Sequence, residues 1–308
     1  MMNTNIWNAD YVKDAILDGN VNLEIIFSNY IKSFIVRLAD YNINLQEIGS
    51  VELLYNRVLD GIEKLEELRK EFIEVIDFFT ASKHPLLKSY LPAFFDNLLN
   101  FYEEQGISLY TGESVDALKN DHYRFFNQSL FIELTALLLE NHCFEALAAI
   151  LHTRYKVYNS SYRLTREVNY FLFQKYNYTL NEYLNTSSPK RLSVTADYIR
   201  KYSKKTCFEK LIRADILLYY ISLWNKTDDL LTPYWYPELS VYNREAEILP
   251  FMVSKSYFEK AKVLFGVNDI SEYKSLLDVT EDLLQSGGVY RVPTLKVGLL
   301  YDEVGSIE

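Results

Sequence analysis

Cysteine, glycine and proline are all scarce in this sequence of 308 residues. The two cysteines, Cys143 and Cys207, do not form a CxxC pair, so neither a disulfide framework nor a zinc knuckle is supported. Ten glycines and seven prolines fall below the average usage of about 7% and about 5%. Because few residues favour tight turns, we expect long helices rather than a succession of short strands.

Long apolar runs are missing as well. The longest ones, such as residues 136–139 and 146–151, are far shorter than the roughly 18 apolar residues of a membrane-spanning helix. Residues 1–5 contain neither the basic region nor the apolar region of a signal peptide. We therefore expect a soluble, cytoplasmic protein that has no membrane partner.

Local catalytic and cofactor motifs are absent too. There is no GxxxxGK[ST] or GxGxxG phosphate-binding loop and no GxSxG nucleophile turn. The four histidines show no metal-site spacing and are interpreted as structural or surface residues: His84, His122, His142 and His152. Helical ribonucleases of the HEPN superfamily would suit the size, but they need an arginine shortly before a histidine, and none is present. We predict no catalytic residue, no cofactor and no metal.

The acidic residues give two different expectations. Asp116, Asp121 and Glu133 lie in one helical segment, and we expect them on an exposed, solvated surface. Asp215 instead stands within the apolar run of residues 214–218. Because a buried charge needs a partner, we expect Asp215 to pair with an arginine or to cap a turn.

Helical periodicity is what the sequence does contain. Apolar residues recur at helical spacing in residues 21–40, 50–80, 84–105, 114–140, 144–155, 162–176, 179–184, 189–204, 207–224, 254–265 and 269–287. Charged residues of the 50–80 helix, Glu66 and Arg69 among them, lie outside its apolar stripe and are expected on a solvated surface. Gly266 is expected to end the helix of residues 254–265, and Asp269 begins a capping-box-like start for the last helix. Twenty-six tyrosines and 18 phenylalanines suit the cores and wet rims of many packed helices. We predict an all-α fold, an irregular bundle or repeat-like stack of about ten helices around the hairpin of residues 114–155. The tail of residues 289–301 alternates weakly and could be extended.

Charge changes sign near residues 159–161. We expect an acidic helical half in residues 1–158 and a second helical half in residues 159–308, joined in one continuous globule. Between Arg154 and Arg213 there are 13 Lys and Arg against 4 Asp and Glu, a local charge of +9. Because the whole chain carries −10, the remainder carries −19. This segregation is the strongest indication of a partner in the sequence.

We call the centre of this basic window the basic face. It consists of eight cations and two tyrosines: Lys190, Arg191, Arg200, Lys201, Lys204, Lys205, Lys210, Arg213, Tyr198 and Tyr202. In the helix of residues 189–204 the inner stripe is predicted to be Leu192, Thr195, Ile199 and Tyr202, which leaves the cations outside. An acidic protein surface is the favoured partner, because a net charge of −10 opposes general affinity for nucleic acid. Interleaved aromatic and basic side chains also suit nucleic-acid bases, which keeps that alternative open.

Several short patterns carry a resemblance over roughly residues 85 to 275. They are Asp121-His122-Tyr123 with Glu133-Leu134, Arg191-Leu192-Ser193 to Ala196-Asp197, Ala214-Asp215, and Trp235-Tyr236-Pro237. With these patterns the chain resembles an uncharacterised family of helical bacterial proteins associated with phage-defence or mobile-element gene clusters. The resemblance implies a sensor or adaptor that works beside an effector, and it supplies no site residues.

Three functional hypotheses follow. The leading one is a non-enzymatic adaptor or regulatory subunit in a bacterial anti-phage defence system, bound to another protein or to a second copy of itself. Abundant tyrosine and segregated charge motivate it, because Tyr and Arg are enriched at binding surfaces. The second is a nucleic-acid-binding accessory protein that uses the basic face. The third is an enzyme whose site is assembled from scattered residues.

Overall fold

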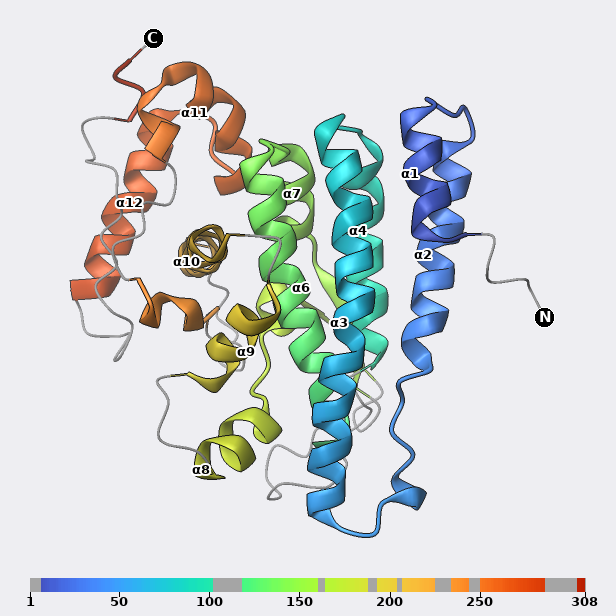
Figure 1. The fold of residues 1–308 in the computed structure, drawn as a ribbon. Helices are drawn as coiled ribbons and strands as arrows, with labels where there is room; N and C mark the ends of the chain where they lie inside the picture. Colours follow the sequence, from blue (N-terminus) through green and yellow to red (C-terminus); the bar gives the residue numbers. More distant parts are fainter. Residues whose placement is uncertain are drawn as a thin grey trace. The chain divides into compact units, whose positions relative to one another are not determined.

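The computed structural model describes residues 7–101, 118–159, 164–187, 193–203, 207–224, 234–243, 250–285 and 304–307. Within these residues the fold is all-α, as predicted, with eleven α-helices and one two-stranded sheet (Figure 1). The chain forms two compact units. Unit 1 comprises Met1–Phe131 and His152–Thr195, and unit 2 comprises Ile132–Leu151 and Ala196–Glu308. The boundary expected between residues 158 and 159 falls inside unit 1.

Unit 1 is built mainly from helices that run side by side (Figure 1). They are α1 (Ala9–Leu17), α2 (Leu23–Ala39), α3 (Val51–Ala81), α4 (Leu86–Leu98) and the first half of α6 (Asp121–Glu140). Helix α1 was not predicted from the sequence, because nine residues give too short a periodic pattern. Its start is nevertheless capped, since the Asn8 side chain accepts a hydrogen bond from the Tyr11 backbone N–H at 2.9 Å.

Helix α3 confirms the longest helix that was predicted. Ser50 caps it by accepting a hydrogen bond from the Leu53 backbone N–H at 3.2 Å. Its apolar stripe is buried, as expected. Glu66 and Arg69 were assigned to the solvated outer side, and this is wrong: both are buried and form an ion pair with each other. An i, i+3 pair can enter a core because each charge compensates the other.

Phenylalanine rings fill the core between α2, α3 and α4. Phe72 stacks on Phe94 with ring centroids 4.3 Å apart, and Phe34 lies 5.0 Å from Phe72. At one end of the same core Phe27 lies 4.4 Å from Phe79. These rings come from three helices, so they hold the helices of unit 1 together by apolar burial and ring contacts.

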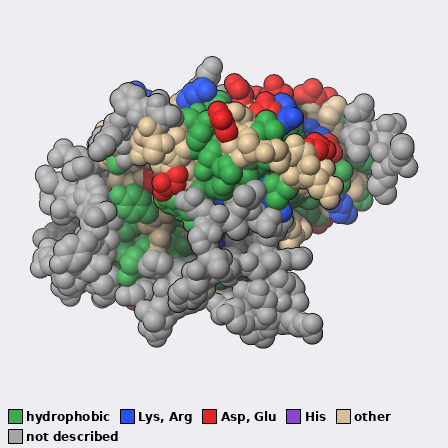
Figure 2. Space-filling model, turned by 90° about the horizontal axis from the view of Figure 1, so that it is seen from below, with side chains coloured by type: hydrophobic (Ala, Val, Ile, Leu, Met, Phe, Trp, Pro, Cys, Tyr) green, Lys and Arg blue, Asp and Glu red, His purple; other side chains and the backbone are tan. Residues whose placement is uncertain are grey.

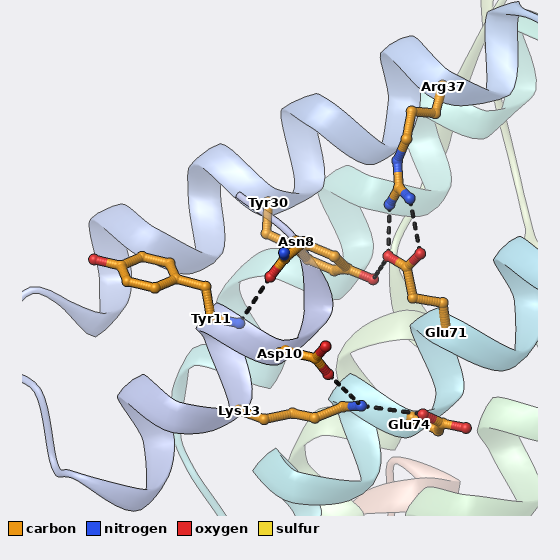
Figure 3. A network of polar contacts seen from close by, with 8 residues as sticks. All are labelled: Asn8, Asp10, Tyr11, Lys13, Tyr30, Arg37, Glu71 and Glu74. Atoms are coloured by element: carbon orange, nitrogen blue, oxygen red, sulfur yellow. Dashed lines mark hydrogen bonds and ion pairs between the residues drawn. The ribbon is translucent and has the colours of Figure 1, made fainter. Parts of the chain in front are cut away.

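Polar contacts at the edge of this core connect α1 and α2 to α3 (Figure 3). Both guanidinium nitrogens of Arg37 donate to the Glu71 carboxylate, at 2.7 and 2.6 Å, and the Tyr30 hydroxyl donates to the same group at 3.1 Å. On α1, Lys13 Nζ lies 3.0 Å from Glu74. The two sets of contacts join α1 and α2 to α3, and Tyr30 combines a buried ring with a hydroxyl bonded to a carboxylate.

A β-hairpin stands where a helix was predicted for residues 162–176. Strand β1 (Tyr155–Asn159) pairs antiparallel with β2 (Leu164–Val168), with Tyr155 opposite Val168. The Lys156 backbone N–H donates to Asp96 on α4 at 2.9 Å, so the hairpin is fixed to unit 1. The β-branched and aromatic residues of these strands favour pairing, and this preference prevailed over the weak helical spacing.

Shorter elements follow the hairpin. They are η3 (Tyr170–Phe173), the π-helical turn η4 (Thr179–Leu184) and α8 (Asn185–Ser187). The predicted helix at residues 179–184 is therefore present, but with π-helical hydrogen bonding.

Unit 2 is organised around α10 (Phe208–Trp224), in which all residues from 214 to 223 are buried. With it lie α7 (Phe144–His152), α9 (Val194–Tyr202), α11 (Lys255–Ala261), η7 (Lys262–Phe265) and α12 (Ile270–Gln285). The expected stops and starts are confirmed. Gly266 ends η7 with φ +65, and Asp269 caps the next helix by accepting from the Glu272 backbone N–H at 3.0 Å.

The C-terminal tail of residues 289–301, whose weak alternation suggested an extended segment, lies outside the described residues. None of the helices in the described ranges combines the length and hydropathy needed to cross a bilayer.

The face shown in Figure 2 gathers Asp and Glu side chains along its upper right edge, with Lys and Arg between them.

Candidate partner-binding face

Six of the ten residues predicted for the basic face are described, and the structure places them on two consecutive helices. Four lie on α9 and two at the start of α10: Tyr198, Arg200, Lys201, Tyr202, Lys210 and Arg213. The other four lie outside the described residues: Lys190, Arg191, Lys204 and Lys205. The six described residues all belong to unit 2.

Helix α9 separates an inner side from a cationic outer side. Thr195 and Ile199 were predicted to point inward, and both are buried. Tyr202 was assigned to the same stripe and is half-buried. Arg200 and Lys201 are exposed, because residues one and two positions after Ile199 turn away from its side of the helix.

The guanidinium of Arg200 contacts two aromatic rings. Its Cζ atom lies 5.4 Å from the ring centroid of Phe208 and 5.1 Å from that of Tyr242. The two rings meet edge to face with centroids 5.3 Å apart, and the Tyr242 hydroxyl donates to Asp197. A cation–π contact orders the guanidinium without neutralising its charge. Among the described residues, no carboxylate lies within ion-pair distance of Arg200.

Lys201 is interleaved with the two tyrosines of α9. Its Nζ atom lies 4.5 Å from the ring centroid of Tyr202 and 5.5 Å from that of Tyr198. It also donates to the Tyr202 hydroxyl at 3.0 Å. The aromatic–basic pattern seen in the sequence is therefore a set of contacts within the helix, and one face of each ring already meets the ammonium group.

The two cations of α10 differ from those of α9. Lys210 Nζ lies 3.0 Å from Glu140 Oε2, so its charge is compensated within unit 2. Arg213 is half-buried, and its Nε atom has no hydrogen-bond partner among the described residues. The exposed positive charge of the described face is thus concentrated on α9.

Sequence reasoning missed the two rings that hold Arg200. Phe208 stands eight positions after Arg200 along the chain, and an aromatic residue at the start of the next helix gave a weak signal. Tyr242 reaches the site from the turn after η5 (Glu238–Val241), and nothing local in the sequence points to it.

Asp215 is fully buried on α10 and confirms one of the two roles expected for it. Its Oδ2 atom accepts from the Leu239 backbone N–H at 2.7 Å, which caps the first turn of η5. Its Oδ1 atom accepts from the Trp235 indole at 2.6 Å, where an arginine was the other expectation. Burial raises the pKa of Asp215 to about 8, although both hydrogen bonds oppose that shift.

The Asp121–His122 pair is structural, and the exposed position expected for Asp121 and Glu133 is wrong. Both acids are buried, while Asp116 lies outside the described residues. Asp121 accepts from the Thr179 backbone N–H at 2.7 Å and from Arg124 at 2.8 Å, so it anchors η4. Thr179 lies 58 residues from Asp121 along the chain, so a periodicity argument could not reveal this partner.

His122 is buried in unit 1 rather than placed at a reactive site. Its Nε2 atom lies 3.0 Å from the Tyr41 carbonyl oxygen. Burial lowers the pKa of His122 to about 4, because the charged imidazolium loses its solvation. The ring is therefore neutral at pH 7, which agrees with its interpretation as a structural histidine.

Unit 1 also contains a small polar pocket of about 180 Å³ between the segment after α2 and the side of α3. Asp40, Glu47 and Asp60 line it together with Arg57 and Lys64. Its mixed charges select no ligand class, and it is smaller than the roughly 300 Å³ at which small-molecule sites usually begin. Within the described ranges, no three His, Cys, Asp or Glu side chains are arranged to hold a metal ion.

Comparisons with known proteins found no match to any family model, to any curated protein or to any solved structure.

Proposed function

We propose that this chain is a non-enzymatic helical adaptor or regulatory subunit that binds an acidic surface of a protein partner through the basic face. The observation that carries the proposal is Arg200. Its guanidinium is exposed, is held against the rings of Phe208 and Tyr242, and has no carboxylate of its own in the described part of the chain.

The guanidinium of Arg200 is already ordered in the unbound protein, and this favours a role in binding a partner. Fixing a long side chain at an interface costs about 0.5–1.5 kcal/mol, and a side chain that is already ordered avoids part of that cost. Arg and Tyr are also the residue types, with Trp, that dominate binding energy at protein interfaces. Arg200 and Tyr242, which contact each other on unit 2, combine these properties.

Charge indicates the kind of partner. The window from Arg154 to Arg213 carries +9 in a chain of −10, so the basic face is the local exception on an acidic molecule. Complementary potentials accelerate encounter and exclude wrong partners. An acidic protein surface fits better than nucleic acid, since the remainder of the chain repels a polyanion.

The sequence resemblance favours an effector of bacterial defence as the partner, with this chain as its adaptor or sensor. The products of the genes that flank its own gene are therefore the proteins to test first.

The test is co-expression with each neighbouring gene product, followed by size-exclusion chromatography with mass measurement. We expect one product to co-elute, and Arg200→Glu to weaken the complex at least about 30-fold, or about 2 kcal/mol. Lys255→Glu is the matched control, since Lys255 is an exposed cation on α11 of the same unit. Arg200→Lys keeps the charge but not the planar guanidinium, so it should give an intermediate loss.

Two results would overturn the proposal. One is the absence of co-elution with every neighbour in a protein that also stays monomeric. The other is an Arg200→Glu complex as strong as the Lys255→Glu complex.

A nucleic-acid-binding accessory protein is the second candidate, supported by the contact between Lys201 and the two tyrosines of α9. Labelled single and double strands titrated at two salt concentrations would test it, because phosphate contacts make binding salt-dependent. Salt-dependent binding that disappears in Arg200→Glu/Lys201→Glu would favour nucleic acid over an acidic protein.

A further inference from the structure

The helical hairpin of α1 and α2 exposes an unusual share of the apolar surface. Eleven large hydrophobic side chains are exposed in the described residues, and five of them lie between residues 11 and 36: Tyr11, Leu17, Val21, Ile25 and Val36. Val21, in the turn between the helices, is 96% exposed, and Leu17 is 71% exposed. Scattered single exposed hydrophobic residues are ordinary, whereas a group on one element marks an interaction site.

Four of these residues lie on α1, in the turn after it or at the start of α2. Leu17 is the last residue of α1, Val21 lies in the turn and Ile25 lies in the first turn of α2, while Tyr11 and Asp14 are exposed on α1. Figure 3 shows the Tyr11 ring pointing away from the Lys13–Glu74 pair that joins α1 to α3. The Tyr11 ring therefore lies on the side of α1 away from that ion pair.

Acidic residues lie next to these exposed apolar side chains, at the end of α1 where negative charge does not stabilise the helix. Asp14 lies in the last turn of α1, Asp18 is its C-cap residue, and the last turn contains no basic residue. Negative charge at a helix C-terminus opposes the helix dipole, so neither acid is placed to stabilise α1. Both are exposed, and neither has a side-chain hydrogen bond or ion pair with another described residue.

We call Tyr11, Asp14, Leu17, Asp18, Val21 and Ile25 the acidic hairpin face. We infer that its occupant is a second copy of this chain, bound through that copy's basic face. The inference rests on the proposed function, because it names the acidic surface that the basic face binds.

Complementary charge and surface type support this pairing. Residues 9–25 contain four acids and one lysine, a net charge of −3, and that lysine is bound to Glu74 and Asp10. The described part of the basic face offers the opposite charge on Arg200 and Lys201, and the rings of Tyr198 and Tyr202 lie beside Lys201. Apolar anchors bordered by charge on one surface thus match aromatic rings bordered by the opposite charge on the other.

The overall charge of −10 does not prevent the contact. At physiological ionic strength the Debye length is about 8 Å, so distant charges are screened while the facing surfaces still interact. The two surfaces differ, so the contact is heterologous, and each copy has one of each to offer.

Sedimentation velocity over a range of protein concentrations tests the inference. The wild type should grow in mean mass with concentration, and the growth should weaken as salt rises from about 50 mM to about 300 mM. Asp14→Arg/Asp18→Arg removes the acidic hairpin face, and Arg200→Glu/Lys201→Glu removes the basic face. Each variant alone should lose association at least tenfold. The two variants mixed in equal amounts should associate again, because one intact face remains on each.

The variants are chosen to separate binding from folding. Arginine at the C-terminus of α1 is favourable for the helix, so Asp14→Arg/Asp18→Arg should keep or raise thermal stability while losing association. Lys255→Glu serves as the charge control and should associate like the wild type. Recovery on mixing cannot arise from two unfolded proteins.

The outcomes distinguish this inference from the proposed function. A wild type that stays monomeric at every concentration overturns the second copy as occupant. If a neighbouring gene product still binds and Arg200→Glu releases it, the proposed function stands. Release of that product by Asp14→Arg/Asp18→Arg would identify a foreign protein as the occupant instead. Association that survives in either double variant also overturns the inference.

Discussion

The indole N–H of Trp235 donates a hydrogen bond to Asp215 across 2.6 Å, and both side chains are fully buried. The same carboxylate accepts the backbone N–H of Leu239 at 2.7 Å. The Trp235 backbone N–H in turn donates to the hydroxyl of Ser222, which lies seven residues after Asp215 on α10, at 3.1 Å. Two polar side chains of α10 therefore hold the segment of residues 235–239, which explains why an aspartate stands inside an apolar run.

Removing the indole donor should destabilise unit 2. Trp235→Phe leaves the buried Asp215 with one donor, and a buried polar group that loses its hydrogen-bond partner costs about 1–3 kcal/mol. Trp224→Phe is the matched control, since it removes the same atoms from a half-buried ring of α10. Urea unfolding should give a larger loss of unfolding free energy for Trp235→Phe. Equal losses would show that ring volume, and not the bond to Asp215, is what matters.

Acid should destabilise unit 1 through His122. Its pKa falls from an ordinary 6.5 to about 4 in the folded protein, so between these values the unfolded chain binds a proton that the folded chain does not. Stability is therefore lost as the pH falls from 6.5 towards 4, by about 3 kcal/mol in total. His122→Gln has no titrating ring and should lose less stability than the wild type over this range, as measured by urea unfolding at several pH values.

The titration of Asp215 changes stability with pH in the opposite direction, so its effect has to be separated from that of His122. Its pKa is raised from 3.8 to about 8, so the folded chain holds an extra proton between these values and stability is lost as the pH rises. Comparison of His122→Gln with the wild type at each pH cancels the contribution of Asp215. A difference that stays constant between pH 6.5 and 4 would contradict the low pKa of His122.

The ends of the helices were predictable where capping residues within one turn determine them. The N-cap Ser50, the glycine stop at Gly266 and the Asp269 cap all depend on residues within one turn, and all three were confirmed or found in place. The buried position of Asp215 was also predictable, because an apolar run surrounds it on one helix. Local pattern was sufficient in each case.

The failures concern charged residues that are buried with a partner, which a periodicity argument assigns to the surface. Asp121 was assigned to a solvated surface, yet its partner Thr179 lies 58 residues away. Glu66 and Arg69 were assigned outward because periodicity treats charge as exposed, although the two charges compensate each other inside. In the candidate site, the exposure of Arg200 followed from periodicity. Its contact with Tyr242 did not.

Gly61 should resist substitution even though it lies in the interior of α3. Gly→Ala in a helix normally gains about 1 kcal/mol. Here a Cβ atom would stand 3.1 Å from the His122 ring, which is tighter than ordinary packing. We expect Gly61→Ala to lose about 1 kcal/mol or more in urea unfolding, because overpacking outweighs propensity.

A double-mutant cycle isolates the ring contact of Gly61. In a His122→Ala background the space is open, so Gly61→Ala should become neutral or stabilising. A Gly61→Ala variant that is equally destabilising in both backgrounds would place the strain elsewhere.

The Glu66–Arg69 pair should be among the most sensitive positions of unit 1. Glu66 Oε2 lies 2.6 Å from Arg69 Nη2, with the side chains 4% and 1% exposed, so Glu66→Gln removes a negative charge that compensates a buried cation. Removing one partner of a buried pair costs about 3–5 kcal/mol. Asp60–Lys64 is the matched control on the same helix, with a separation of 2.7 Å and both side chains about half exposed.

Asp60→Asn should change the unfolding free energy by less than about 1 kcal/mol, because solvent screens an exposed pair. The contrast with Glu66→Gln therefore measures burial rather than charge. Similar values for the two variants would mean that water reaches Arg69. The double change Glu66→Leu/Arg69→Met should cost less than Glu66→Gln alone, because it removes the uncompensated charge together with its partner.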